Sequence, residues 1–203
     1  MAAVVAEYQA ALTHWQPLFD QLDDLDQHCW VVEPEKPTRE ACFRRIAIGN
    51  HRSLHIILDP ARPNSAPQSV MVYGSDSLVR PLREALNAGL GSWDGSTTVR
   101  ANLERIMGIV MPARPRRQGE GGSAADEIAL EEHSAECGIC YSLRAHEAGE
   151  LPEKVCNNPK CGRPYHNECL VEWLHSLPNT VQSFGTLFGK CPYCSDSISA
   201  KTR

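Results

Sequence analysis

The sequence contains no apolar run that approaches the roughly 20 residues of a membrane-spanning helix, so no membrane partner is expected. Basic charge is also in short supply, because 25 acidic residues face 20 lysines and arginines and give a formal net charge of −5. That balance argues against direct nucleic-acid binding through phosphate contacts. The first residues, MAAVVAEYQAALTHW, lack a basic segment and include Glu7, so they do not resemble a signal peptide, and we expect an intracellular protein.

Cysteine is scarce in the first 136 residues, where only Cys29 and Cys42 occur. The other seven cysteines lie between Cys137 and Cys194. A chain of 203 residues can hold one domain of about 110–150 residues and a small module, and the uneven cysteine distribution predicts that division. Cys29 and Cys42 are expected to be small buried hydrophobic residues rather than ligands or nucleophiles.

The N-terminal segment has the apolar period of an amphipathic helix from about residue 3 to residue 25. Pro17 lies inside this pattern and predicts a kink or a break, because proline lacks the amide hydrogen and its ring clashes with the preceding turn. We expect the apolar positions at helical spacing to pack in a core; they are Val4, Tyr8, Ala11, Leu12, Trp15, Phe19 and Leu22.

The rest of the first 112 residues shows strand and helix patterns in a fixed order. Segments 42–50 and 53–60, with Gly49-Asn50 between them, predict a hairpin, and segment 66–76 predicts a third strand. Segment 31–37 is expected to form a turn. Two helices follow: one over 77–90, capped by Ser75 or Asp76 and interrupted near Pro81, and one over 96–110 with Val99, Leu103, Ile106, Met107 and Val110 on one face. This order predicts an α+β lobe over residues 1–112 with helices covering one face of an antiparallel sheet.

Residues 113–134 differ in composition from both neighbours. Arginines at 114, 116 and 117 precede a Gly/Ser stretch and then acidic residues, which is typical of a linker. The basic patch Arg114–Arg117 can contact a partner or serve as a weak nuclear-import element, although a solvated linker is the simpler interpretation.

Residues 135–200 carry eight candidate metal ligands in four pairs. Zinc prefers four nitrogen or sulfur donors in a tetrahedron, and a CxxC turn lets two thiolates reach one ion from a single loop. A disulfide framework needs an oxidising compartment and leaves the histidine unexplained, so we expect two zinc ions per chain. The pairs are Cys137 with Cys140, Cys156 with Cys161, His166 with Cys169, and Cys191 with Cys194.

Four pairs can combine in sequence, as two fingers in series, or alternately, as in the cross-brace of a RING domain. Alternate pairing ties the ends of a roughly 60-residue segment across its middle and gives a rigidity that so small a core lacks. In that arrangement Cys137, Cys140, His166 and Cys169 hold the first ion, and Cys156, Cys161, Cys191 and Cys194 hold the second.

The ligand order of four cysteines, one histidine and three cysteines fits both PHD fingers and some RING domains. A PHD finger normally has tryptophan two places before the seventh ligand, where this chain has Gly189. A RING ubiquitin ligase normally has three apolar residues at set places around its ligands, occupied here by Ile139, Trp173 and Pro192. These residues favour a RING ligase. A PHD-like reader or adaptor without transfer activity is the alternative, and a purely structural zinc module is a third possibility.

Motifs along nearly the whole chain resemble the Fanconi anaemia group L family, whose members are the RING ubiquitin ligases of the Fanconi pathway. The motifs are ECGICYS, VCNNPKCGRPYHNECLVEWL and SFGTLFGKCPYCSDSI, with WVVEPEKPTR, RRIAIGN and GIVMPAR upstream. The resemblance runs from about Trp15 to Ile198 and implies a UBC/RWD-like substrate-binding lobe followed by a RING domain. The family's N-terminal E2-like domain and first lobe are expected to be absent.

The resemblance also implies an activity. The RING would bind a ubiquitin-charged conjugating enzyme (E2) through Ile139, Tyr141, Trp173 and Pro192. The lobe would dock the paired Fanconi substrate proteins, one lysine of which is monoubiquitinated in DNA interstrand crosslink repair. Fanconi core complex subunits are implied as further partners, with the nucleus, and also the cytoplasm, as location. No residue of the chain is expected to be catalytic, because a RING ligase only positions the reactants.

Position 195 departs from the pattern of many active RING ligases. Those proteins have arginine or lysine directly after the last ligand, where it bridges the conjugating enzyme and ubiquitin. This chain has Ser195, whose short hydroxyl cannot span that gap. We therefore expect weak intrinsic activation that depends on a complex.

Overall fold

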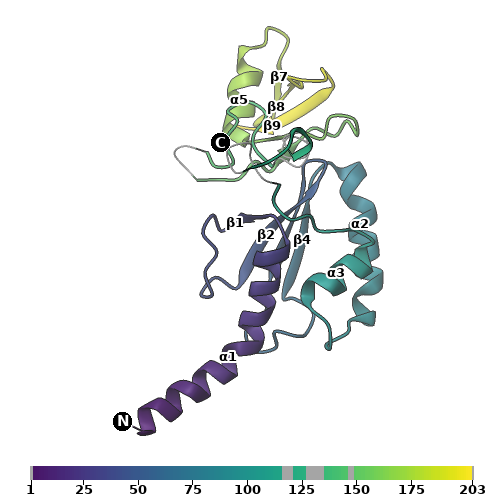
Figure 1. The fold of residues 1–203 in the computed structure, drawn as a ribbon. Coiled ribbons are helices and arrows are strands. Elements are labelled where there is room, and N and C mark those ends of the chain that lie inside the picture. Colours follow the sequence, from purple (N-terminus) through teal and green to yellow (C-terminus); the bar gives the residue numbers. More distant parts are fainter. Residues whose placement is uncertain (1, 116–120, 127–134, 146–148, 203) are drawn as a thin grey trace.

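The computed structural model describes residues 2–115, 121–126, 135–145 and 149–202. Figure 1 shows two bodies: a lobe, residues 2–115, and a smaller C-terminal module, residues 135–202. Every strand pair among the described residues is antiparallel, and both bodies contain helices as well as strands, so the α+β prediction is confirmed. Arg116 and Arg117 of the predicted linker lie outside the described residues.

The lobe contains a four-stranded sheet in the order β1 (Val31–Glu33), β2 (Phe43–Gly49), β3 (Arg52–Ile57) and β4 (Ser69–Tyr73). The predicted hairpin is present, and Asn50 and His51 close it with φ values of 50° and 54°, the left-handed backbone of a tight hairpin turn. The expected turn over 31–37 is wrong at its start, where Val31 pairs with Ile46. A strand of three residues is too short to show an alternating pattern in the sequence.

Helix α1 (Ala2–His28) continues through Pro17, so of the predicted kink or break the break does not occur. A proline removes one backbone hydrogen bond, and burial of the apolar residues that follow outweighs that loss. The apolar residues that the described part of α1 buries are Leu18, Leu22 and Leu25.

The apolar face predicted for this helix is only partly correct. Leu22 is buried, but Leu12 and Trp15 are 41% and 39% exposed, because the first half of α1 extends beyond the sheet (Figure 1). The side chains of Val4, Tyr8 and Ala11 lie outside the described part of the structure.

Helices α2 (Asp76–Gly89) and α3 (Val99–Met107) pack beside the sheet, with the short turn η1 (Leu90–Ser92) between them. The predicted interruption at Pro81 is wrong, since α2 runs through it. Gly108, with φ 64°, ends α3 earlier than predicted. Val110 therefore falls outside the helix and is 79% exposed, which corrects its assignment to the buried face.

The core of the lobe lies between the helices and one face of the sheet. Cys29 is buried in it, as predicted, and burial raises the pKa of its thiol to about 12. Cys42 is only half-buried at the edge of the same core. Among the described residues of the lobe, the largest fully buried apolar side chains are Leu22, Leu25, Ile46, Leu54, Ile56, Leu58 and Leu103.

Arg44 is the one charged residue among the largest fully buried side chains of the described chain. Its guanidinium forms a two-pronged ion pair with Asp26, with N–O distances of 2.6 and 2.8 Å. It also donates to the backbone carbonyls of Thr38, Ala41 and Phe43. One side chain therefore fastens the β1–β2 loop to α1.

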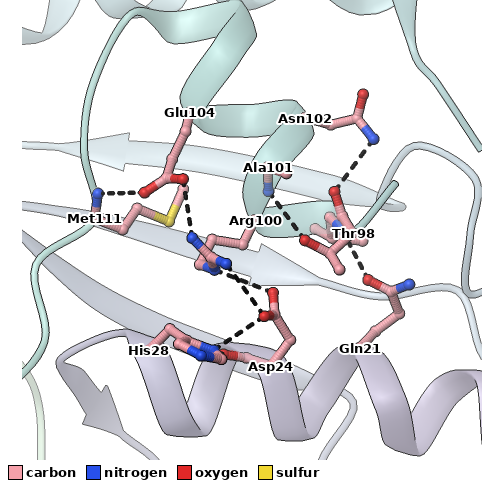
Figure 2. A network of polar contacts seen from close by, with 10 residues as sticks. Gln21, Asp24, His28, Thr98, Arg100, Ala101, Asn102, Glu104 and Met111 are labelled. Carbon is pink, nitrogen blue, oxygen red and sulfur yellow. Dashed lines mark hydrogen bonds and ion pairs between the residues drawn. The ribbon is translucent and has the colours of Figure 1, made fainter. Parts of the chain in front are cut away.

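A polar network fixes the point at which the chain leaves the lobe (Figure 2). Arg100 on α3 binds Asp24 on α1 and Glu104 on its own helix. Glu104 in turn accepts a hydrogen bond from the amide of Met111 at 2.8 Å, and the next carbonyl, of Pro112, accepts from the amide of Trp30 at 2.7 Å. The exit of the lobe therefore lies against the start of β1.

The C-terminal module contains helix α5 (Asn167–Ser176) and two small sheets. One sheet pairs β5 (Lys154–Val155) with β6 (Pro164–Tyr165), and the other orders β7 (Val181–Ser183), β8 (Thr186–Lys190) and β9 (Ser197–Lys201). No helix in the described part of the chain has both the length and the apolar character needed to cross a bilayer.

Candidate metal centres and the surface beside them

The eight predicted ligands form two clusters that could hold metal ions. Within each cluster the donor atoms all lie within 4.8 Å of one another. All nine cysteines are free, so the module is not a disulfide framework. The grouping is alternate rather than sequential: Cys137, Cys140, His166 and Cys169 form the first cluster, and Cys156, Cys161, Cys191 and Cys194 form the second.

Two matching turns present the CxxC pairs. We call them the knuckles: residues 137–140 and residues 191–194. In the first, the amide of Tyr141 donates to the carbonyl of Cys137 at 2.9 Å, and in the second, Ser195 donates to Cys191 at 3.1 Å. Tyr141 and Ser195 have φ values of 56° and 59°. Each knuckle therefore closes with a left-handed residue directly after its second cysteine, which turns both thiols towards one point.

The donor separations fit a four-coordinate ion. A tetrahedron with zinc–sulfur bonds of about 2.3 Å places its donors roughly 3.8 Å apart. In the second cluster the sulfurs of Cys156 and Cys194 are 3.5 Å apart, and those of Cys161 and Cys191 are 3.9 Å apart. In the first, Nδ1 of His166 lies 3.3 Å from the sulfur of Cys140. Four donors leave no open coordination position, so the clusters suit structural rather than catalytic ions.

His166 is oriented by a contact on the far side of its ring. Its Nε2 lies 3.3 Å from the carbonyl oxygen of Leu143, which can only accept a hydrogen bond. That contact requires the hydrogen on Nε2 and leaves the lone pair of Nδ1 pointing into the cluster. His166 is also fixed by its place as the residue preceding α5.

The thiols of the second cluster differ in acidity. Burial raises the pKa of Cys156, because a thiolate there loses its hydration. Burial acts on Cys191 in the same direction, but hydrogen bonds from the backbone of Cys194 and from the hydroxyl of Tyr165 outweigh it and lower the pKa of Cys191 to about 7. A dication bound here must displace the protons of these thiols, because the thiolate is the form that ligates a metal.

Tyr165 was not singled out from the sequence, although it lies directly before a ligand. Its side chain is fully buried, and its hydroxyl lies 3.1 Å from the sulfur of Cys191. Tyr165 precedes His166 of the first cluster and contacts Cys191 of the second, so it joins the two centres through the core. In the sequence, the only sign of this role is that an aromatic residue directly precedes the ligand His166.

The predicted partner-binding residues surround the knuckles. Ile139 and Trp173 are half-buried against the same core, and the indole N–H of Trp173 donates to the carbonyl of Lys190 at 3.1 Å. Pro192 is half-buried in the second knuckle. Tyr141 is 69% exposed, and its hydroxyl lies 2.9 Å from that of Tyr193, which brings the two knuckles side by side.

Tyr193 and Arg163 are further members of this surface that sequence reasoning missed. The guanidinium of Arg163 lies 4.0 Å from the centre of the Tyr193 ring. A β-carbon at Gly138 would lie 3.0 Å from Tyr165 and 3.2 Å from Tyr193. A glycine in the first knuckle therefore allows the Tyr193 ring to lie over it. The tyrosine inside the second CxxC motif was the available signal.

Gly189 bears on the choice between RING and PHD modules. A β-carbon at this position would lie 2.6 Å from Cδ2 of Leu174, which is fully buried. A tryptophan, which PHD fingers have here, would not fit unless this core rearranged.

Comparison with known proteins agrees with this architecture. Residues 17–114 match the family model described as FANCL UBC-like domain 3, and residues 133–203 match the FANCL C-terminal domain. The E3 ubiquitin-protein ligase FANCL of Mus musculus is 39% identical over 198 residues, covering 98% of this chain and 49% of that protein. The Fancl protein of Drosophila melanogaster, also named an E3 ubiquitin-protein ligase, is 28% identical over 192 residues, covering 95% and 49%.

A solved structure gives the same result. A crystal structure of FANCL superposes with a TM-score of 0.64 at 27% sequence identity, covering 98% of this chain and 52% of that one. The chain spans about half the length of the curated relatives it matches.

Proposed function

Because the chain belongs to the FANCL family, we propose that it is a RING-type E3 ubiquitin-protein ligase that binds a ubiquitin-charged E2. The observation that carries the proposal is the meeting of the two knuckles: alternate Cys/His pairs cluster, and the hydroxyls of Tyr141 and Tyr193 join the loops beside them. Sequential fingers would leave these loops apart. Because the two knuckles lie side by side, segments that are far apart in the sequence form one surface.

Each of the two clusters would hold one Zn²⁺, giving two ions per chain. The ion supplies structural binding energy, about 10–16 kcal/mol in small zinc modules near pH 7, and performs no chemistry on the substrate. The donor set supports this assignment, since thiolates with one imidazole at tetrahedral spacing are typical of closed structural zinc sites. The residues that would hold zinc are Cys137, Cys140, His166 and Cys169, and Cys156, Cys161, Cys191 and Cys194.

The E2 would dock on the surface formed by Ile139, Tyr141, Trp173 and Pro192. Its support is the combination of half-buried apolar side chains with an exposed tyrosine, which is typical of the anchors of protein interfaces. The chain would act by position alone: it holds the donor thioester near an acceptor lysine, which makes a bimolecular reaction effectively unimolecular. No cysteine of this chain needs to carry ubiquitin.

The UBC-like lobe would hold the substrate protein whose lysine accepts ubiquitin. We propose that it docks the paired Fanconi substrate proteins, that one lysine of the pair is monoubiquitinated in DNA interstrand crosslink repair, and that Fanconi core complex subunits are further partners. The nucleus, with a cytoplasmic pool, is the proposed location. The family assignment supports these statements, and the tight core of the lobe supplies a rigid surface for docking.

A single experiment tests the ligase proposal. The zinc-loaded chain is mixed with each of a panel of ubiquitin-charged E2s and free lysine, and the loss of thioester is followed with time. At least one E2 should discharge faster with the chain than without it, and zinc removal by a chelator should abolish the gain. No acceleration with any E2 would contradict the ligase function and favour a non-catalytic adaptor.

A further inference from the structure

The module and the lobe touch through loops that adjoin the two metal clusters. Arg144 lies four residues after the ligand Cys140, and its Nη2 donates to Oε1 of Glu33 on the lobe at 3.0 Å. Gly162 directly follows the ligand Cys161, and a β-carbon there would lie 3.7 Å from the carbonyl oxygen of Asn50. One loop from each cluster therefore lies against the lobe.

Both ends of the Glu33–Arg144 ion pair are held by other contacts. Glu33 ends β1 and pairs in register with Arg45 of the neighbouring strand. Arg144 also donates from Nη1 to the carbonyl of Gly149 at 3.1 Å, so its guanidinium is fixed within the module as well. Burial lowers the pKa of Arg45, while the carboxylates of Glu153 from the module and Glu33 from the lobe act in the opposite direction. The ion pair thus joins the last residue of β1 to the loop that follows the ligand Cys140.

A groove of about 850 Å³ runs beside this ion pair and has walls from both bodies. Trp30 and Val32 contribute from the lobe, and Tyr141, Arg144 and Tyr193 contribute from the module. Tyr141 is also a proposed contact of the E2. The surface that would receive the E2 therefore begins at the junction of module and lobe, where a small rotation of one body changes its position relative to the other.

We propose that Glu33 and Arg144 are positioning residues for ubiquitin transfer: their ion pair sets the angle between the E2-binding surface and the lobe that presents the substrate. This proposal rests on the ligase function proposed above. In the transfer step the lysine nitrogen attacks the thioester carbonyl, a C–N bond forms, the C–S bond breaks, and the E2 cysteine leaves as the amine loses its proton. The reacting atoms must approach to about 3–3.5 Å, and a misplacement of about 1 Å can slow such a step roughly 100-fold.

The ion pair between Glu33 and Arg144 contributes little to the free energy of unfolding. The side chains of Arg144 and Glu33 are 40% and 20% exposed, and ion pairs at such exposure add little to the free energy of unfolding. Variants that remove the pair should therefore fold, bind metal and keep the E2 surface, so a change in transfer can be assigned to orientation.

The test is a double-mutant cycle in the full zinc-loaded chain: Glu33→Gln, Arg144→Gln and both together. Glutamine removes each charge. At Glu33 it keeps the shape of the side chain, which spares the nearby Arg45, and at Arg144 it is shorter than arginine. Arg39→Gln is the control, because it removes an exposed ion pair with Asp23 within the lobe. Two reactions are measured for each variant: E2 discharge to free lysine, which needs no lobe, and ubiquitin transfer to the paired Fanconi substrate proteins.

Each single variant should lower kcat for transfer to substrate about threefold to fivefold, with KM little changed, and the double variant should be no slower than the singles. Discharge to free lysine should stay within about twofold of the wild type, as should both reactions of the control. Transfer at the wild-type rate in the single variants, losses that add in the double variant, or an equal loss of free-lysine discharge would each overturn the positioning role. If the wild-type chain itself fails to discharge any E2 to free lysine, the ligase function fails instead.

Discussion

The hydroxyl of Tyr141 lies 2.9 Å from the hydroxyl of Tyr193, although 52 residues separate them in the chain. Tyr141 follows the last cysteine of the first knuckle, and Tyr193 lies inside the second. Because the Tyr141 side chain is 69% exposed, the core holds little of its ring in place. The hydrogen bond therefore sets how the most exposed residue of the proposed E2 surface is presented.

Tyr193→Phe removes this hydrogen bond and keeps the ring under Arg163. A net hydrogen bond contributes about 0.5–1.5 kcal/mol, so the dissociation constant for the E2 should rise about twofold to tenfold, with no loss of metal. Calorimetric titration measures the change. Tyr73→Phe is the control, because its hydroxyl lies in the lobe and contacts only the sulfur of Met71 among the described partners. Unchanged affinity in Tyr193→Phe would show that Tyr141 is held without the bond.

Trp173→Ala should abolish most E2 binding while both metal ions stay bound. Truncation of a central aromatic anchor costs about 2 kcal/mol or more, which is roughly 30-fold in the dissociation constant. Trp173 ligates nothing, and the ligand nearest to it in sequence is Cys169, four residues away. His175→Ala, an exposed residue on the same helix, should bind normally. Retained binding in Trp173→Ala would favour the reader or structural-module hypotheses over the ligase.

Ser195→Arg should speed ubiquitin discharge from the charged E2. Ser195 is exposed directly after the last cysteine of the second knuckle, and its φ of 59° is already left-handed, so arginine meets little added backbone strain. A long cation there can reach both E2 and ubiquitin, which the serine hydroxyl cannot. Discharge rates are compared at equal E2 occupancy. A rate equal to or below that of the wild type would show that this position does not limit activation.

Arg44→Met should lower the free energy of unfolding of the lobe by about 3–5 kcal/mol, because it leaves the Asp26 carboxylate and three backbone carbonyls without their buried donor. Arg39→Met is the matched comparison. It breaks an equally short ion pair, 2.7 Å from Asp23, that is 57% and 37% exposed, and should cost about 1 kcal/mol or less. Urea unfolding followed by circular dichroism distinguishes the two. If both variants lost a similar free energy of unfolding, the burial of Arg44 would not explain how much its ion pair stabilises the lobe.

The parts of the site that sequence predicted are those encoded by local spacing. The two members of each ligand pair are only a few residues apart, so the pairs are visible in the sequence. The sequence also shows glycine at 189, where a PHD finger has tryptophan, and the structure gives the reason in the contact with Leu174. The strands at 43–49 and 52–57 were found for the same reason, since a tight turn joins them.

The parts that sequence missed depend on contacts between distant residues. Glu33 and Arg144 are 111 residues apart, and no local pattern marks either as half of an ion pair. Helix α1 runs through Pro17 because the core retains the residues after it, and Val110 is exposed because Gly108 ends α3. At Pro17, tertiary packing overrides the local preference of proline, and at Val110 the backbone angle of Gly108 overrides the helical period.

Two interleaved zinc sites are the claim on which the E2 surface, its orientation and the ligase activity all depend. The most direct measurement is the zinc content of the purified chain, beside Cys140→Ala from the first cluster and Cys156→Ala from the second. We predict two equivalents of zinc in the wild type and one in each variant. In Cys140→Ala, the loss of the first ion should make Cys169 reactive towards thiol reagents. In Cys156→Ala, the loss of the second ion should do the same for Cys191 and Cys194. Fewer than two equivalents in the wild type, or exposure of the neighbouring pair in sequence instead, would contradict the interleaved arrangement.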